Sequence, residues 1–296
     1  MQAIKDKIEE YLLEIDHQKA KDIIASIQMG KMLRSRLILS IAPNSEQSVK
    51  LCAIVEMIHL ASLLHDDVID TSATRRGEAS INAQYGNHTA IMLGDILYSL
   101  AFSKLTNLEP IIAQRLSRSV MLLSVGEFVD VELSHAINED KELYLEMTYK
   151  KTSSLIEACA YCAGILADKD ATRLGEFGKN LGICFQLIDD MLDIFGEESK
   201  LGKPNFGDFK EGKTTLIYIF LLQYCNEIDR QFVINLFQKE LTSSDKSTLL
   251  SMIDKYNIKE ISKDFIKNFE DKAMALLLED EIELQAILQK TITRDY

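Results

Sequence analysis

Two acidic motifs of the same pattern, Asp-Asp-x-x-Asp, stand at residues 66–70 and 189–193, and each follows an apolar run. On an α-helix, positions i and i+4 share a face, so the first aspartate of each motif lies above the last. Carboxylates at the end of a buried helix repel one another and are costly to desolvate unless a cation or basic partners neutralise them. The repetition therefore predicts two helices whose acidic ends form one cleft bridged by a hard divalent cation.

The rest of the chain favours helix over strand. Only three prolines, Pro43, Pro110 and Pro204, interrupt its 296 residues, there is no tryptophan, and Leu, Ile, Ala, Glu and Lys dominate. These are strong helix formers, so we predict an all-α fold. The chain contains no linker-like segment, and we expect one domain over residues 1–296, with a division into two left open by the length.

Apolar residues at helical spacing predict helices over about 46–70, 83–105 and 111–135, and another from residue 175 into the second motif. Residues 196–213 form the one long glycine-rich loop of the sequence. Loops of this length in compact domains are usually functional or disordered, and the lysines of this loop beside an acidic motif favour function.

Charge and cysteine content restrict the class of protein. The net charge of −13 argues against a general nucleic-acid-binding surface but does not exclude an anionic ligand held by local basic residues. Five cysteines, an odd number, predict reduced thiols in the cytoplasm, and the C-x-x-C at 159–162 is expected to pack in the core. The apolar stretches near 155–167 and 215–225 are too short to span a bilayer, so we expect a soluble protein.

Basic residues gather near the acidic motifs in the sequence. Each one alone is as well explained as ordinary surface charge. Together with two metal sites they indicate diphosphate, an anion that takes both Mg²⁺ and direct Lys or Arg contacts. The residues are Lys31, Arg34, Arg75, Arg76, Lys150, Lys151, Lys203 and Lys213.

These motifs, in this order, resemble those of the trans-prenyltransferases, or polyprenyl diphosphate synthases. The resemblance runs through Gly-Lys-x-x-Arg at 30–34, both acidic motifs, Arg-Arg-Gly at 75–77, Lys-Thr at 151–152, Phe-Gln at 185–186, Gly-Lys-Pro at 202–204 and Glu-Gly-Lys at 211–213. The chain departs from the family pattern at Met29, Ser35 and Ile217, where the family usually has Gly, Pro and Pro. These departures affect loop geometry and leave every charged ligand position filled.

The resemblance implies a homodimeric isoprenoid-synthase helical bundle around a central cavity. It implies a Mg²⁺-dependent prenyltransferase that joins an allylic diphosphate, such as farnesyl diphosphate, to successive isopentenyl diphosphates. The allylic C–O bond would ionise, the isopentenyl double bond would attack the cation, and a proton would then leave to the released diphosphate.

Roles for individual residues follow from the same resemblance. Asp66, Asp70 and Asp189 would hold more than one Mg²⁺, assisted by Asp67, Asp190 and Asp193. Arg75, Lys151, Thr152, Gln186 and Lys203 would contact the allylic diphosphate, with Lys213 also in the substrate-binding set. Isopentenyl diphosphate would bind Lys31, Arg34, His59 and Arg76 without metal. Asp66, Asp70, Lys151, Asp189 and Lys203 would carry the catalysis.

Product length is expected to depend on Ala61 and Ser62, about one helical turn before the first motif. Small side chains there would leave a tunnel open, which predicts a long product, about hexaprenyl to octaprenyl, of the kind used for quinone side chains. The alternative is that both residues merely permit helix packing. If the tunnel is open at Ala61 and Ser62, Met121 and Phe128 are candidates for its floor deeper down. Release of so apolar a product would need at most transient membrane contact.

Three other functions were weighed. Glu56-x-x-His59 and Glu132-x-x-His135 match the di-iron pattern of ferritin-like bundles, which would leave the acidic motifs without a role. A terpene cyclase also ionises a prenyl diphosphate, but has no use for the predicted isopentenyl-binding residues. A non-catalytic partner subunit of a synthase need not retain both metal motifs.

Overall fold

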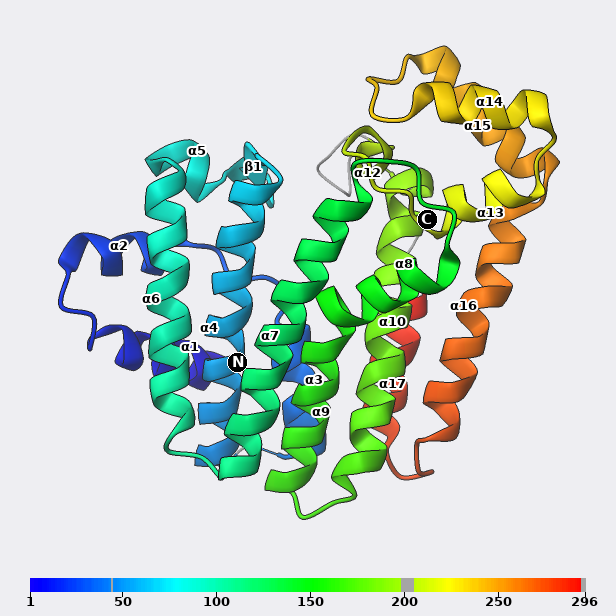
Figure 1. Ribbon diagram of the computed structural model, residues 1–296. Helices are drawn as coiled ribbons and strands as arrows, with labels where there is room; N and C mark the ends of the chain where they lie inside the picture. Colours follow the sequence, from blue (N-terminus) through cyan, green and yellow to red (C-terminus); the bar gives the residue numbers. More distant parts are fainter. Residues whose placement is uncertain (44, 198–204, 294–296) are drawn as a thin grey trace. The chain divides into compact units, whose positions relative to one another are not determined.

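The computed structural model describes residues 1–43, 45–197 and 205–293, and the helices confirm the all-α prediction (Figure 1). The first elements are α1 (Gln2–Leu12), α2 (Gln18–Ser26), α3 (Leu33–Ile41), α4 (Glu46–Ile69), β1 (Thr74–Arg75), β2 (Glu78–Ala79), α5 (Ile81–Tyr85), α6 (Asn87–Leu105) and α7 (Pro110–Leu133). The others are α8 (Lys141–Thr148), the π-helix η1 (Tyr149–Ser153), α9 (Ser154–Leu166), α10 (Ala171–Phe195), α12 (Gly207–Lys210), α13 (Leu216–Tyr224), α14 (Glu227–Leu236), α15 (Ser243–Lys255), α16 (Ile258–Ala275) and α17 (Ile282–Ile292).

Two local features differ from the sequence prediction. The helix expected over 83–105 is divided into α5 and α6 at Gly86, whose φ of 86° a helix cannot contain. A short antiparallel hairpin, β1–β2, was not predicted and follows the first acidic motif. Its two turn residues, Arg76 and Gly77, both have positive φ, 56° and 82°, as a type I′ hairpin turn requires.

The chain divides into two compact units. The first comprises residues 1–120 and 155–175, and the second comprises residues 121–154 and 176–296. The first acidic motif belongs to the first unit, and the second motif belongs to the second unit. The single domain expected over the whole chain stays a prediction.

Helix α4 is the core of the first unit. The Ser45 hydroxyl caps its start by accepting a hydrogen bond from the Ser48 N–H at 3.1 Å. It packs on α1, α3 and, most extensively, α6 (Figure 1). A Cβ on Gly94 of α6 would lie 2.2 Å from His65 Nε2, so the absence of a side chain lets these two helices approach. By length and composition α4 could cross a membrane, but 67% of its most apolar window is buried in the protein, as in a core helix.

The second unit is built around α10 and α13. Most apolar side chains between Ile183 and Ile194 of α10 and those from Leu216 to Leu222 of α13 are buried together with residues of α15 and α16. Phe209 of α12 stacks on Tyr218 of α13 with ring centroids 4.0 Å apart. Helix α12 is thereby fixed to the core beside the last turns of α10.

A π-helical turn, Tyr149–Ser153, joins α8 to α9. This turn, η1, lies against two glycines of neighbouring helices. A Cβ on Gly126 of α7 would lie 2.3 Å from the Lys151 nitrogen, and one on Gly182 of α10 would lie 2.6 Å from Ser153 Cα. Single π-helical turns inside α-helices are frequent at functional sites.

Candidate active site

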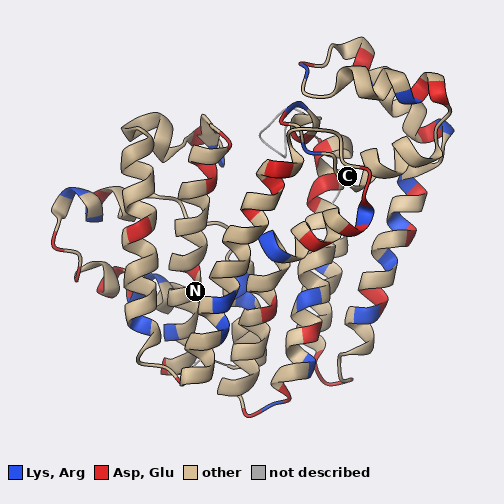
Figure 2. Cartoon of the chain, in the orientation of Figure 1, with Lys and Arg blue, Asp and Glu red and all other residues tan. Residues whose placement is uncertain are grey.

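The first acidic motif occupies the last turn of α4. Asp70 caps the helix, and its N–H donates to the Asp66 carbonyl at 2.8 Å. Both side chains are half-buried, whereas Asp67 is only 2% exposed. Acidic residues colour this end of the helix in Figure 2. The helix dipole places partial negative charge at this end of α4. A bound cation is therefore favourable there, whereas carboxylates without a cation are not.

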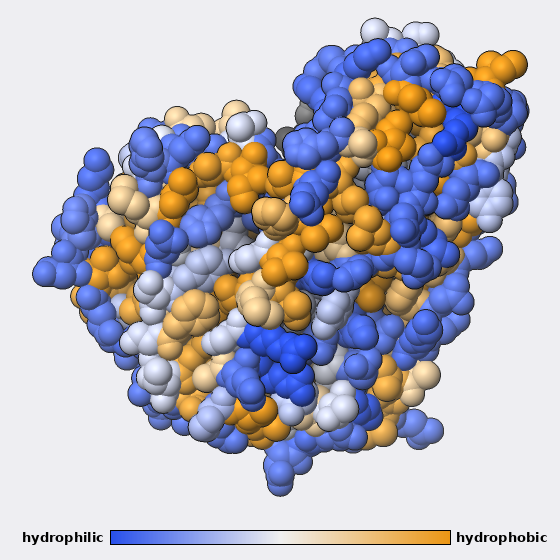
Figure 3. Space-filling model, in the orientation of Figure 1, coloured by the Kyte–Doolittle hydropathy of each residue, from blue (hydrophilic) through white to orange (hydrophobic). Residues whose placement is uncertain are grey.

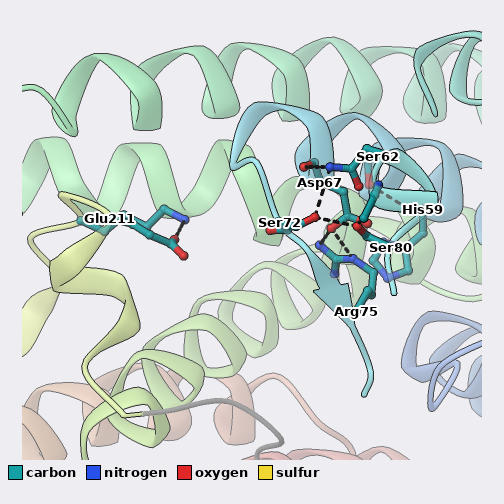
Figure 4. A network of polar contacts seen from close by, with 10 residues as sticks. His59, Ser62, Asp67, Ser72, Arg75, Ser80 and Glu211 are labelled. Carbon is teal, nitrogen blue, oxygen red and sulfur yellow. Dashed lines mark hydrogen bonds and ion pairs between the residues drawn. The ribbon is translucent and has the colours of Figure 1, made fainter. Parts of the chain in front are cut away.

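Asp67 is engaged by Arg75 from the hairpin. Arg75 Nε and Nη2 lie 2.7 and 2.6 Å from Asp67 Oδ1 (Figure 4). The Asp67 carbonyl accepts from the Ser72 N–H at 2.9 Å and from Asn82 Nδ2 at 3.0 Å. The Ser80 hydroxyl donates to the Ser72 carbonyl at 2.6 Å. These contacts fix the hairpin, and with it Arg75, to the end of α4.

A basic group gathers beside this motif. Burial lowers the pKa of His59 well below its usual value, and the positive charges of Arg34, Arg76 and Arg75 lower it further. Arg34 Nε is buried without a hydrogen-bond partner. Arg76 donates to the Gln28 carbonyl and crosses Gly30, where a Cβ would lie 2.5 Å from its Nη2. The structure thus brings Arg34, His59 and Arg76, which were assigned to isopentenyl diphosphate, close to Arg75, which was assigned to the allylic diphosphate. Lys31, the fourth residue of the isopentenyl diphosphate group, is exposed in the segment before α3.

The second acidic motif occupies the last turns of α10 (Figure 2). Asp189 is half-buried, while Asp190 and Asp193 are 4% and 2% exposed. Asp190 accepts hydrogen bonds from the Tyr144 hydroxyl and, at 2.8 Å, from Gln186 Nε2. Burial, with repulsion from Asp208 and Asp189, raises the pKa of Asp190 to about 8.

Two residues predicted to contact substrate are joined here. The Thr152 hydroxyl of η1 donates to Gln186 Oε1 at 2.8 Å, while the amide nitrogen of Gln186 donates to Asp190. The amide orientation of Gln186 is fixed at both ends. Tyr144, which donates to Asp190 at the end of this series of hydrogen bonds, is 2% exposed. It was not predicted from the sequence, because a lone tyrosine on an amphipathic helix carries no distinguishing signal.

Asp193 connects α10 to the chain after the glycine-rich loop. Its Oδ2 accepts from the Asp208 N–H at 3.2 Å, and its carbonyl accepts from the Phe206 N–H at 2.8 Å. Lys213 forms an ion pair with Glu211 at 2.7 Å, which Figure 4 also shows. Lys203, a predicted catalytic and substrate-binding residue, lies outside the described residues.

Lys151 is held by two carboxylates that the sequence analysis missed. Its Nζ lies 2.7 Å from Glu127 Oε2 and 2.5 Å from Asp130 Oδ2, both on α7. Burial lowers the pKa of Lys151, but the attraction of Asp130 and Glu127 outweighs it and raises the pKa overall. The signal available in the sequence was a pair of acids three residues apart after a glycine, among the apolar residues of the second half of α7.

The donors suit magnesium even though no group of three or more His, Cys, Asp or Glu side chains among the described residues is arranged to hold a metal. Mg²⁺ is usually bound by one or two carboxylates together with water and substrate phosphates, and seldom by an all-protein cage. The first motif supplies two half-buried carboxylates, Asp66 and Asp70, and the second supplies one, Asp189, each near a helix C-terminus, which fits that mode. The chemistry of the donors therefore agrees with the predicted cofactor.

The di-iron alternative is wrong. Glu56 is buried and accepts from the Ser35 hydroxyl at 2.6 Å, whereas Glu132 and His135 are exposed in the other unit. No metal-binding cluster involves any of them within the described part of the chain. Cys159 and Cys162 are free, buried thiols, as expected for core packing.

Comparison with known proteins identifies the family. A model of the polyprenyl synthetase family matches residues 17–253. The geranylgeranyl diphosphate synthase of Sulfolobus acidocaldarius is 35% identical over 259 residues, which cover 82% of this chain and 77% of that protein. The octaprenyl diphosphate synthase of Escherichia coli is 36% identical over 195 residues, covering 63% of this chain and 60% of that one. The crystal structure of octaprenyl pyrophosphate synthase from Helicobacter pylori superposes with a TM-score of 0.94 at 39% identity, over 99% and 98% of the two chains. With its two carboxylate motifs and its basic group, the chain therefore belongs to the polyprenyl synthetase family of metal-dependent prenyltransferases.

Proposed function

We propose that this prenyltransferase is an all-trans polyprenyl diphosphate synthase that extends an allylic diphosphate, farnesyl diphosphate, to a product of about hexaprenyl to octaprenyl length. The observation that carries the proposal is the basic group beside the first acidic motif. Arg34, Arg76 and a neutral His59 lie close to Arg75, which Asp67 holds in place. Arg34 Nε is buried and lacks an acceptor, which a diphosphate oxygen would supply.

Asp66, Asp70 and Asp189 would hold the metal, which when bound polarises the diphosphate and neutralises the charge of the leaving group. Asp67 orients Arg75, and Asp190 orients Gln186. The second aspartate of each motif therefore acts by positioning a substrate-binding side chain. These contacts support the assisting role proposed for both residues, while Asp193 binds the backbone at Phe206 and Asp208.

The chain's own groups then divide the work. Lys151, Arg75 and the hydroxyl of Thr152 would bind the allylic diphosphate and stabilise its charge as the C–O bond breaks. Arg34, His59, Arg76 and Lys31 would hold isopentenyl diphosphate so that its double bond meets the allylic carbon. Orientation of two bound substrates replaces a bimolecular encounter, and an apolar surround keeps water from the cation.

A long product is supported by small residues one turn before Asp66. Ala61 is fully buried, and Ser62, 4% exposed, donates from its hydroxyl to the His59 carbonyl at 2.9 Å. Neither presents a bulky side chain to a growing isoprenoid. Met121 and Phe128, proposed as a deeper floor, are 56% and 67% exposed in the single chain, so they need a partner or a lipid to cover them.

A homodimer is the proposed assembly. Helix α6 exposes the side chains of Ile91 and Met92, 41% and 57%. Figure 3 shows that apolar residues also reach the surface on the face in view. A second copy of the chain would remove these apolar side chains from water. The proposal extends to a cytoplasmic enzyme that supplies quinone side chains and contacts membranes only when it releases product.

The test is to incubate the purified chain with Mg²⁺, farnesyl diphosphate and labelled isopentenyl diphosphate, with and without chelator, and to resolve the dephosphorylated products by length. A metal-dependent series that ends at hexaprenyl to octaprenyl supports the proposal. A product that stops at geranylgeranyl would show that the tunnel closes near Ala61. Conversion of farnesyl diphosphate to cyclic products, or no condensation, would support the cyclase or partner-subunit alternatives.

A further inference from the structure

We propose that Glu127 and Asp130 are positioning residues for the reaction: they hold the Lys151 ammonium group where it meets the diphosphate of the allylic substrate. The inference rests on the proposed function, because it assumes that Lys151 binds that diphosphate. It concerns two buried carboxylates that neither the acidic motifs nor the family resemblance singled out.

Glu127 and Asp130 both contact the Lys151 ammonium group, and we call this pair of carboxylates the clamp. Glu127 Oε2 and Asp130 Oδ2 lie 2.7 and 2.5 Å from the same Lys151 Nζ. The two acids are three residues apart on α7 and so share one helix face. Both are only 6% exposed, whereas the Lys151 side chain is 23% exposed, so the lysine extends from a buried acidic site toward solvent.

The backbone is shaped for the same contact. The π-helical turn η1 carries Lys151, and it lies so close to α7 that Gly126 has no room for a Cβ. Gly126 directly precedes Glu127, so the position of closest backbone approach is adjacent to the carboxylate that binds the lysine. The rigid contact fixes the base of the Lys151 side chain, and the two carboxylates fix its tip.

The charge balance argues that this clamp has a purpose other than binding anions directly. The single positive charge of Lys151 faces two negative charges, those of Glu127 and Asp130. Lys213 is close enough to repel Lys151 but is itself paired with Glu211. Two buried carboxylates beside a diphosphate would weaken its binding if they did nothing else. Holding a flexible lysine in one orientation removes an ordering cost at the moment when leaving-group charge develops, which offsets that repulsion.

The experiment compares Glu127→Gln and Asp130→Asn with Lys151→Met in the full-length protein. Glu132→Gln is the matched control, since Glu132 is an exposed carboxylate on the same helix. Steady-state kinetics would be measured with farnesyl and isopentenyl diphosphates. Calorimetry would measure binding of an unreactive thiodiphosphate analogue of farnesyl diphosphate in the presence of Mg²⁺.

We expect Asp130→Asn to lower kcat/KM for the allylic substrate by about tenfold or more, as loss of a charge-assisted hydrogen bond does. KM for isopentenyl diphosphate and the Mg²⁺ concentration for half-maximal rate should not change. In the Lys151→Met background the same substitution should have little further effect on analogue binding, because the clamp then has nothing to hold. Glu132→Gln should behave as wild type.

Tighter analogue binding by Glu127→Gln and Asp130→Asn would overturn the inference, since it would show that the acids only repel the substrate. Equal losses in the wild-type and Lys151→Met backgrounds would overturn it too, as would a shifted Mg²⁺ requirement, which would make the acids cation ligands. Circular dichroism and thermal unfolding identify variants that fail to fold, and Lys151→Arg, which retains the charge, then provides a second comparison. A wild-type protein that forms no polyprenyl product would instead refute the proposed function.

Discussion

Arg75 contacts a single oxygen of Asp67, with its Nε and Nη2 at 2.7 and 2.6 Å from Oδ1. Asp67 is buried, whereas the Arg75 side chain is 33% exposed. The pair joins the buried end of α4 to the hairpin that carries the basic residues. The second aspartate of the first motif therefore serves an arginine of the site.

The pairing of Arg75 with Asp67 predicts that substituting the two residues lowers the free energy of unfolding by different amounts. Arg75→Met leaves a buried carboxylate without its partner and should lower the free energy of unfolding by about 1–3 kcal/mol. Asp67→Asn leaves an arginine that can reach solvent and should cost less. Both substitutions should raise KM for the allylic diphosphate. Urea unfolding and steady-state kinetics test this, and equal destabilisation by the two variants would contradict it.

Metal dependence should follow the half-buried aspartates. Asp66→Ala and Asp189→Ala should lower kcat by a factor of about 10³ or more, since they weaken charge stabilisation of the leaving group. Asp66→Asn should raise the Mg²⁺ concentration needed for half-maximal rate. Asp95→Asn, which changes an exposed carboxylate of α6, is the control. An unaltered Mg²⁺ titration in Asp66→Asn would rule this residue out as a ligand.

Product length should respond to the small residues before the first motif. Ala61→Phe would place an aromatic ring one turn from Asp66, where it should stop elongation at about geranylgeranyl length or shorter. Ala61→Ser is the size-matched control and should keep the wild-type product. Chromatography of the dephosphorylated lipids gives the answer. Unchanged length in Ala61→Phe, with activity retained, would show that the tail takes another path.

His59 should make stability depend on pH. Its pKa is depressed in the folded protein, chiefly by burial and then by three arginines, so below its ordinary value of 6.5 the unfolded chain binds a proton that the folded chain does not. This contribution to stability is present above that pH and is lost as the pH falls, with a slope of at most about 1.4 kcal/mol per pH unit. Urea unfolding of wild type and His59→Gln between about pH 5 and 7.5, the titration range of histidine, tests the difference. Parallel profiles would contradict the prediction.

The contact between α7 and η1 should tolerate no added methyl group. Gly126→Ala would place its Cβ 2.3 Å from the Lys151 nitrogen and should destabilise the protein by about 1–3 kcal/mol while lowering kcat/KM. Gly175→Ala is the control, because its nearest neighbour would lie 3.4 Å away. That variant should be neutral or slightly stabilising, since alanine favours a helix. Thermal unfolding and the condensation assay measure both effects.

The sequence by itself determined the helical class, the two acidic motifs at helix ends and the basic residues near them, because each depends on spacing within one segment. The family resemblance assigned Arg34, His59 and Arg76 to isopentenyl diphosphate and Arg75 to the allylic diphosphate, and the structure places these four side chains near one another. Periodicity and residue order suffice for such inferences.

Only the tertiary structure decided which partners the polar groups take. Asp67 pairs with Arg75, Asp190 binds Tyr144 and Gln186, and Lys151 lies between Glu127 and Asp130. The Gln186–Asp190 contact lies within one turn of α10, but the other pairings join different elements of the fold, and that of Lys151 also depends on the close contact at Gly126 and on the π-helical turn. Spacing along the chain carries no information about pairings between elements, because burial and packing select one partner among many acids and bases.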